Sequence, residues 1–539
     1  MQFSRPMRLT GIALAAACTL ALSACSGSSD SKVDTFQIAV NTDGGHQAWS
    51  DAVTNQISNT LGIKSTTKSY ASFDELRTDV TERTIKTAFR TGWQPDYPSI
   101  YNYLQPIYFT GAGSNDGDYS NKDFDGLMRQ VAGAQDPEQA YKLQADAQAV
   151  LMKDLPAIPL WYSNIAAVYS KKVDNVTFNW QNQPEYAGIT KAEGKILTHG
   201  TQPQNPLIPT ATNEVGGGNV INQMYSGLVR YTADGETVND VAESITSKDN
   251  KTWTVKIKSG QKFSDGSAVN ADSFLKAWNY GAAGKNKQLN SYFFYPIVGF
   301  DDAQADKADT MSGLKKVDDL TFTIELAQAE ASFPARLGYS AFFPVPVKAF
   351  DDLKAYGRAP IGNGPYKMAS KDAWEDDVQI ELVKNDAYQG DIKVKNKGLL
   401  FKFYTNLEAA YTDVQAGNLD VLESVPDGSL KTFTTDKKVN AISEPGSVFQ
   451  SFTIPVTAEH FGMDEEGRLR RAAISMAINR EAITDKVFHG TRTPASDFSS
   501  PLMPGWTDKI EGNDVLQYNP EKAKELWAKA DKINKWTTK

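Results

Sequence analysis

The sequence predicts an α/β protein. Helical and strand patterns are mixed along all 539 residues, and no short tandem repeat or long low-complexity tract interrupts them. An apolar fraction of 40% and a charged fraction of 22% are typical of a globular protein. The length is sufficient for more than one domain.

The predicted elements follow in order along the chain. Asp136 precedes a proline at the first helical position, and apolar residues then recur at helical spacing until Pro156 ends the pattern. Apolar and polar residues alternate over 253–258 and 320–326, which predicts two strands that each bury one face. Asn519, also followed by a proline, predicts the start of a last helix.

Glycine-rich segments predict turns and close backbone approaches. Ser-Asp-Gly at 264–266 and Gly-Asn-Gly-Pro at 362–365 have the composition of turns. The triple glycine at 216–218 does not fit a G-x-G-x-x-G nucleotide motif. It predicts instead a place where the backbone comes close to another group.

The chain opens with a pattern typical of a lipoprotein signal. Two arginines and an uncharged run over 9–22 lead to Leu-Ser-Ala-Cys, which ends at Cys25. The run is too short to span a membrane comfortably, and a plain secretory signal would need no cysteine at this place. We therefore expect residues 1–25 to be a signal whose Cys25 is lipidated, with 26–35 as a flexible tether to the outer face of the cell membrane. Simple secretion is the alternative.

Several classes of protein are excluded by composition. Cys18 and Cys25 are the two cysteines, so the chain beyond the signal has no disulfide, thiol nucleophile or cysteine-based metal centre. The four histidines are far apart, and no H-E-x-x-H, P-loop or G-x-S-x-G motif is present. The net charge of −9 and scattered basic residues argue against nucleic acid as a partner. We expect a monomer with no catalytic residue, metal or cofactor.

An acidic segment at 116–120, Asp-Gly-Asp-Tyr-Ser, has some likeness to a calcium loop. Asn121 at the sixth position and Leu127 at the twelfth replace the glycine and glutamate that such a loop requires. Ser120, with Asp123 three residues later, predicts the start of a helix instead.

Residues 90–98, Arg-Thr-Gly-Trp-Gln-Pro-Asp-Tyr-Pro, place a cation, an anion and two large aromatics within nine positions. This segment resembles the ligand-binding segment of extracellular solute-binding protein family 5, the oligopeptide- and dipeptide-binding components of ABC importers. Further stretches that resemble the same family are 155–162, 241–266, 361–366 and 469–483. Together they are spread along nearly the whole chain after the signal.

The order of these segments differs from that of the family. Family members begin with a strand and loop similar to 194–231, which here follow residues that resemble the family's ending. Residues 36–49 resemble a strand that normally comes after a helix like 519–530. A circular permutation is the simplest explanation, with old ends joined near 191–194.

A permutation makes a geometric prediction. The new ends would have opened between Lys539 and Phe36, so the start and end of the mature chain should be adjacent. We expect the strand from Phe36 to lie beside elements of the last hundred residues, with Phe36 near Lys535.

The resemblance implies two α/β lobes joined by a hinge, with a smaller α/β domain added to one lobe and a clamp that closes on its ligand. The expected parts are a first lobe of 33–162 and 442–539, a second lobe of 163–232 and 357–441, and an additional domain of 233–356.

The resemblance also implies a binding site. Asp96 matches the carboxylate that receives the α-ammonium of a peptide, which would supply the cation that a buried carboxylate needs. Its alternative role is to pair with a structural cation or to cap a turn. Arg90 matches a cation that balances the site or meets a ligand carboxylate, with a structural ion pair as the alternative. Trp93 would form an apolar wall, with core packing as the alternative.

Main-chain contacts complete the expected site. Gly92, Gln94 and Val215 match positions whose backbone pairs with the ligand as an added strand, so the peptide sequence would matter little. Gly216 to Gly218 would then leave room for the ligand to approach closely, although the family often has bulkier residues there.

These observations predict a lipid-anchored receptor that captures short peptides outside the cell and delivers them to an ABC permease. Within the same fold, the alternative is a non-peptide solute such as an oligosaccharide, an opine, haem or a nickel chelate. Two more distant alternatives are a lipoprotein hydrolase and an adhesin. The sequence has no nucleophile motif to support the first and no repeats to support the second.

Overall fold

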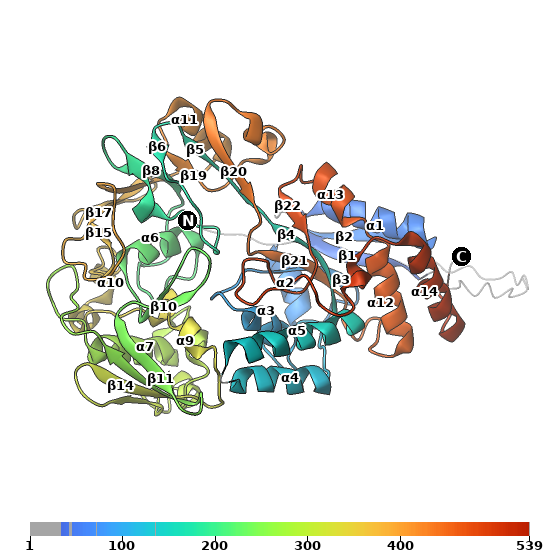
Figure 1. The fold of residues 1–539 in the computed structure, drawn as a ribbon, viewed down its shortest axis with the longest axis horizontal. Helices are drawn as coiled ribbons and strands as arrows, with labels where there is room; N and C mark the ends of the chain where they lie inside the picture. Colours follow the sequence, from blue (N-terminus) through green and yellow to red (C-terminus); the bar gives the residue numbers. More distant parts are fainter. Residues whose placement is uncertain (1–33, 43–45, 72, 135, 538–539) are drawn as a thin grey trace, which may run out of the picture.

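The computed structural model describes residues 34–42, 46–71, 73–134 and 136–537, which form two α/β lobes and a smaller additional domain (Figure 1). The first lobe is built on a six-stranded sheet of order β2-β1-β3-β21-β4-β22. Its strands are β1 (Phe36–Asn41), β2 (Ser65–Tyr70), β3 (Ala88–Trp93), β4 (Ala157–Ser163), β21 (Phe449–Thr453) and β22 (Arg492–Pro494). Its helices are α1 (Gln47–Leu61), α2 (Phe73–Thr81), α3 (Ile100–Tyr108), α4 (Lys122–Gly133), α5 (Pro137–Asp154), α12 (Glu465–Met476), α13 (Arg480–Lys486) and α14 (Pro520–Ile533).

The second lobe is built on a mixed sheet of order β15-β17-β18-β8-β19-β5-β20, in which β16 also pairs with β17. Its strands are β5 (Ile165–Ser170), β8 (Ile196–Gly200), β15 (Tyr366–Met368), β16 (Trp374–Glu375), β17 (Gln379–Lys384), β18 (Gly398–Phe403), β19 (Val421–Leu422) and β20 (Val439–Glu444). Two short ribbons and two helices accompany it: β6 (Val173–Asp174), β7 (Thr190–Lys191), β9 (Val229–Tyr231), β10 (Thr237–Asn239), α6 (Val215–Met224) and α11 (Leu407–Ala416).

The additional domain has a four-stranded antiparallel sheet of order β11-β12-β14-β13. Its elements are β11 (Ala242–Ser247), β12 (Thr252–Ile257), β13 (Leu314–Lys316), β14 (Thr321–Glu325), α7 (Ala271–Ala282), α8 (Phe300–Gln304), α9 (Phe333–Arg336) and α10 (Leu353–Tyr356). The two strands predicted by alternation are β12 and β14. Val255, Ile257, Phe322 and Ile324 are fully buried, so the predicted buried face is confirmed.

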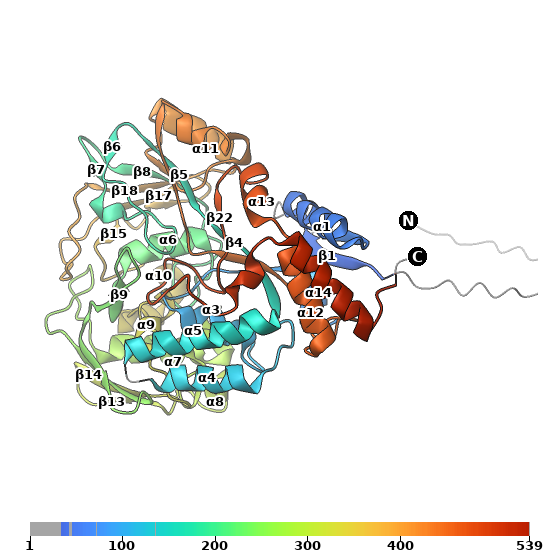
Figure 2. The same cartoon turned by 45° about the vertical axis from the view of Figure 1, so that its right-hand side comes forward.

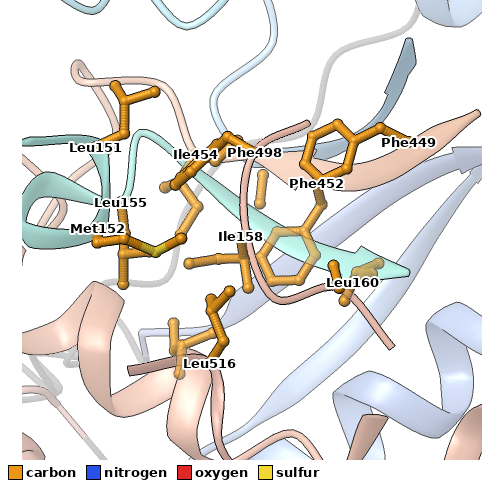
Figure 3. Close-up of a cluster of buried hydrophobic side chains, with 14 of the residues drawn as sticks. Leu151, Met152, Leu155, Ile158, Leu160, Phe449, Phe452, Ile454, Phe498 and Leu516 are labelled. Atoms are coloured by element: carbon orange, nitrogen blue, oxygen red, sulfur yellow. The ribbon is translucent and has the colours of Figure 1, made fainter. Parts of the chain in front are cut away.

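The core of the first lobe joins residues from both ends of the chain. Figure 3 shows Leu151 and Leu155 at the end of α5 beside Ile158 of β4, with Phe449 and Phe452 of β21 in the same cluster. All five side chains are almost inaccessible to solvent. Burial of this apolar surface holds sequence-distant strands in one sheet.

Two strand connections cross between the lobes. The chain passes from β4 to β5 through Asn164, and it returns from β20 to β21 through residues 445–448 (Figure 1). The second crossing lies a few residues after the expected boundary at 441/442, because β20 still pairs with β5 in the second sheet. Such short crossings are the geometry of a hinge between two lobes.

The described ends of the chain are adjacent, as expected. The Asp34 amide donates to the Thr537 carbonyl at 3.0 Å, and the Thr537 amide donates to Asp34 Oδ2 at 2.7 Å. The Phe36 ring lies 5.5 Å from the ring of Phe461, and α1 and α14 are neighbours (Figure 2). Asp34 therefore belongs to the folded lobe, although the tether was expected to extend to residue 35. The predicted signal and Cys25 lie outside the described residues.

The helix starts show what local sequence can predict. Asp136 caps α5 and Asn519 caps α14, as expected. The predicted cap Ser120 is wrong, because the side chain of Asn121 accepts from the amides of the first turn of α4. The acidic residues just before it form ion pairs: Asp116 with Arg77 and Arg83, and Asp118 with Arg83.

Within the described ranges, no helix is both long and apolar enough to cross a membrane.

Candidate ligand-binding cleft

A cavity of about 510 Å³ lies between the two lobes. The first lobe contributes Gln94, Pro95 and Asp96 from the loop after β3. The other walls come from residues 179–187, from α6 and the residues around it, from 225–233, and from 338–343 of the segment that ends the additional domain. A cavity whose walls come from both lobes changes shape when the hinge moves.

Asn102 positions Asp96. Ser99 caps α3, and this places Asn102 in the first turn of the helix, where it is buried. Asn102 Oδ1 accepts from the Asp96 amide at 2.9 Å and from Trp93 Nε1 at 3.1 Å. Asn102 Nδ2 donates to Asp96 Oδ2 at 3.2 Å. One amide side chain therefore fixes both the loop and the carboxylate.

The carboxylate of Asp96 lacks a direct cationic partner. Among the described residues, no lysine, arginine or histidine nitrogen lies within 4.0 Å of its oxygens. Burial raises the pKa of Asp96, and this effect exceeds the opposing effects of the Asn102 hydrogen bond and the charge of Arg336. Arg336 is itself bound to Glu330 at 2.6 Å and lies over the ring of Tyr97. A ligand ammonium would supply the missing partner.

Arg90 lies away from this cavity. It is on β3, where its Nε donates to Asn41 Oδ1 at 2.8 Å and its guanidinium lies 4.5 Å from the ring centroid of Phe73. It is not among the residues that line the cavity. The geometry therefore favours a structural role for Arg90 over the expected contact with ligand.

Gly92 and Trp93 come just before Gln94 in the chain, but they are not among the residues that line the cavity. Trp93 is half-buried, and its indole packs against the core of the first lobe while bonding Asn102. Gly92 is exposed and is opposite Gln450 in the pairing of β3 with β21. The parallel pairing of β3 with β1 includes only Ala88 and Phe89, so the end of β3 has an open edge. An open edge is what an added ligand strand requires.

Val215 lines the cavity, but not as part of a strand. It is the first residue of α6, 68% exposed, and Glu214 caps this helix by accepting from the Gly217 amide at 3.0 Å. The first amides of a helix have no partner within it, so Val215 can still offer its N–H to a ligand. Val215 is thus helical, and its expected backbone contact with a ligand stays a prediction.

The triple glycine has a protein neighbour. A Cβ at Gly216 would lie 2.5 Å from Thr201 Oγ1, and one at Gly217 would lie 2.5 Å from Glu214 Oε1. A Cβ at Gly218 would meet nothing within 4 Å. The predicted close approach is confirmed for Gly216, although its partner is Thr201 and not a ligand.

Other cavity residues were not singled out from the sequence. They are the aromatics Trp180, Tyr186, Tyr225, Tyr231, Tyr339 and Phe343, and the charged residues Glu185, Arg230 and Asp240. They are spread over more than 150 positions, and no local motif joins them. The fold brings them together, so no spacing rule would have found them.

One group of described residues has side chains of the kind that bind metals. Ligand atoms of Asp34, Glu459 and His460 lie within 4.8 Å of one another, beside a second cavity near the chain ends. His460 Nδ1 is 2.7 Å from Glu466 Oε1, and its Nε2 is 3.4 Å from Asp34 Oδ2. The contacts of the imidazole with these two carboxylates account for this arrangement without an ion.

Comparisons with known proteins agree with this fold. The family model for bacterial extracellular solute-binding proteins, family 5 Middle, matches residues 236–539. The oligopeptide-binding protein OppA of Bacillus subtilis is 31% identical over 323 residues, which are 57% of this chain and 58% of that protein. The dipeptide-binding protein DppE of the same organism is 29% identical over 391 residues, 69% of each chain. This chain thus matches less than two thirds of the length of OppA.

A solved structure supports the architecture. The unliganded open form of the periplasmic murein tripeptide-binding protein MppA aligns with a TM-score of 0.52 at 24% identity. The alignment covers 63% of this chain and 66% of that chain. This likeness concerns the fold alone. Because the family model matches more than half of the sequence, the chain belongs to the bacterial extracellular solute-binding proteins of family 5, and it is a solute-binding protein and not an enzyme.

Proposed function

We propose that this protein is the peptide-binding component of an ABC importer, which captures short peptides outside the cell and delivers them to a membrane permease. The observation that carries the proposal is Asp96, a carboxylate that lines a cavity between two lobes without an ion pair among the described residues. Relatives named for oligopeptide and dipeptide binding support the same ligand class.

The contacts suit a peptide main chain. The α-ammonium would bind the Asp96 carboxylate in a charge-assisted hydrogen bond, which fixes the register of the peptide. The open edge of β3 beyond Phe89 would pair with the backbone of the ligand, and Gln94 would lie beside it. The N–H of Val215 at the start of α6 would face the same ligand from the second lobe.

A panel of di- to pentapeptides in a thermal-shift assay tests this function. A ligand at 100 times its dissociation constant should stabilise the protein by about 2.7 kcal/mol. Free peptides should raise the melting temperature, and N-acetylated versions should raise it much less because they lack the ammonium. If no peptide of the panel shifts the transition, the peptide function is wrong.

A non-peptide solute is the alternative. Among such solutes, the aromatic residues of the cavity lining favour an oligosaccharide. Trp180 and Tyr231 lie edge to face in the cavity wall with ring centroids 5.3 Å apart, and Tyr231 is the partly exposed ring of the pair, the one on which a sugar ring can stack. The same assay with oligosaccharides, opines, haem and nickel chelates would distinguish these ligands. A shift with one of them and none with peptides would favour the alternative.

We also propose that the chain is a circular permutation of the family order. The mutual hydrogen bonds of Asp34 and Thr537 support it, since chain ends this close can be joined by a short linker. The turn before β8, where Gly194 has φ of +81°, is the expected junction of the old ends. None of the three alignments above covers more than 69% of the chain, as expected when a sequential alignment meets reordered segments.

A reordered chain tests the permutation. Residues 194–537, a short Gly/Ser linker and residues 34–191 should fold with the same melting temperature and peptide affinity as the original order. A series of linker lengths controls for strain at the new joint. Failure at every length would contradict the proposal.

Lipidation of Cys25 is part of the proposed function, because an anchored receptor stays near its permease. Replacing Cys25 with serine should release the protein from the membrane, and mass spectrometry of the wild-type protein should find acyl chains on its first mature residue. Since Asp34 belongs to the first lobe, the anchor would hold the lobe that carries Asp96. Release of the wild-type protein into the medium without acylation would favour simple secretion.

A further inference from the structure

The cavity that contains Asp96 carries more negative than positive charge. Its charged lining residues, within the described chain, are four carboxylates and one guanidinium: Asp96, Glu185, Glu214, Asp240 and Arg230. We propose that this cavity selects peptides with a cationic side chain, lysine or arginine. The inference rests on the proposed function and names the ligand class within it.

Two of the carboxylates already have a role. Asp96 is assigned to the peptide ammonium. Glu214 accepts from the Gly217 amide, and its charge lies at the positive end of the α6 dipole. The surplus charge therefore comes from Glu185 and Asp240, which share the single Arg230.

Arg230 does not form a direct ion pair with either of them. Its charge lowers the pKa of both carboxylates, yet no nitrogen of Arg230 lies within 4.0 Å of a carboxylate oxygen among the described residues. Its Nε is buried without a hydrogen-bond partner. The guanidinium is close enough to act on both acids but too far away to bond either.

Burial dominates the electrostatics of both acids. It raises the pKa of Glu185, to which only the side-chain amide of Asn179 donates a hydrogen bond among the described residues, at 2.9 Å. It also raises the pKa of Asp240, which is 4% exposed, against the opposing effects of a hydrogen bond from Ser226 and of the charges of Arg230 and Lys258. A buried acid without a full complement of partners is stabilised by a second cation.

The wall around these acids also suits a cation. Trp180, Tyr186 and Tyr231 line the same cavity, Trp180 and Tyr186 as nearly fully buried rings and Tyr231 as a partly exposed one. Aromatic faces attract ammonium and guanidinium groups, while their apolar bodies accommodate the methylene stem of lysine or arginine. A ligand carboxylate at this end would instead meet two acids that already share one guanidinium.

Calorimetry with matched tripeptides tests the inference. Lysine and its uncharged isostere norleucine are each placed at the first, second and third position of trialanine, so that charge alone differs within a pair. We expect at least about tenfold tighter binding of the lysine peptide at one position. In the double variant Glu185→Gln, Asp240→Asn the ratio of the dissociation constants of the norleucine and lysine peptides should fall toward one.

A matched control is the double variant Asp174→Asn, Glu193→Gln, which removes two exposed carboxylates of the same lobe. It should keep the ratio of the wild-type protein. If the cavity double variant does not fold, each single variant should lower the ratio in part, and circular dichroism identifies which proteins are folded.

The outcomes separate this inference from the proposed function. Equal binding of lysine and norleucine peptides, or a ratio that survives the loss of both acids, overturns the cationic preference and leaves peptide binding intact. Binding of no peptide at all overturns both.

Discussion

Arg471 in the core of the first lobe and Asp96 at the cavity differ in how far the protein satisfies their charges. In the first lobe, Arg471 is fully buried and donates to the carbonyls of Leu155, Ile454 and Phe461. In the cavity, Asp96 keeps a carboxylate without an ion pair among the described residues. The protein itself supplies the partners of Arg471, whereas it leaves Asp96, the proposed contact for a ligand ammonium, without an ion pair among the described residues.

Removing a saturated charge should have the largest effect. Arg471→Met leaves three buried carbonyls without donors, and we expect a loss of roughly 3–5 kcal/mol in the free energy of unfolding, measured in urea. The exposed Arg129→Met should change it by less than about 0.5 kcal/mol. Similar losses for both variants would contradict the distinction.

Asp497 is a buried acid within the first lobe, and it sharpens the comparison through pH. Tyr162 and Ser499 donate to its oxygens, yet burial raises its pKa to about 6. The folded protein thus binds more protons than the unfolded chain between about pH 4 and 6, so this residue's contribution to stability falls as the pH rises through that window.

The variant Asp497→Asn isolates this effect. The stability of the wild-type protein relative to the variant should decrease by roughly 2–3 kcal/mol from pH 4 to pH 7, measured as paired urea denaturations. The difference, and not either curve alone, is informative because other groups titrate in the same range. A difference that is constant with pH would mean that Asp497 does not titrate there.

Asp96→Asn should leave the fold intact and weaken binding. We expect about a 10- to 100-fold loss of affinity for free peptides, the cost of losing a hydrogen bond between two charged groups, and little change for N-acetylated peptides. Calorimetry measures both. Asp146→Asn on the exposed surface of α5 is the matched control. Equal loss for free and acetylated peptides would place the ammonium elsewhere.

The glycines at the start of α6 provide the smallest effects. Gly216→Ala should destabilise by about 1–3 kcal/mol, because its Cβ would meet the backbone of Thr201 at 2.6 Å. Gly218→Ala should stabilise by up to about 1 kcal/mol, since its Cβ meets nothing within 4 Å and alanine favours a helix. Urea denaturation compares them. The opposite order would mean that α6 shifts to relieve the contact.

Local features of the fold could be read from the sequence. Caps and alternation depend on neighbours along the chain, so the starts of α5 and α14 and the strands β12 and β14 were predictable. Ser120 and Asn121 are adjacent candidates for one cap, and a single sequence does not rank them. The adjacency of Asp34 and Thr537 followed from segment order, a global property.

The predicted residues that line the cavity came from one short motif and, for Val215, from the family resemblance. Asp96 and Gln94 belong to one short motif, and both line the cavity. Arg90 belongs to the same motif but lies on β3, where Asn41 and Phe73 engage it, so proximity in sequence was misleading. No local pattern in the sequence includes Glu185, Arg230 and Asp240 together. The fold alone places them on one cavity.

The place of β21 in its sheet determines when the first lobe can form. β21 lies between β3 and β4, yet it is made almost three hundred residues after β4, once the second lobe and the additional domain have been synthesised. Until it arrives, β3 and β4 each present an unpaired edge, the kind of surface on which strands of other chains add. The second lobe has a similar delay, because β5 pairs with β19 and β20, which follow it in the chain after the additional domain. During synthesis and export, β3 and β4 of the first lobe therefore keep unpaired edges until roughly the last ninety residues have emerged.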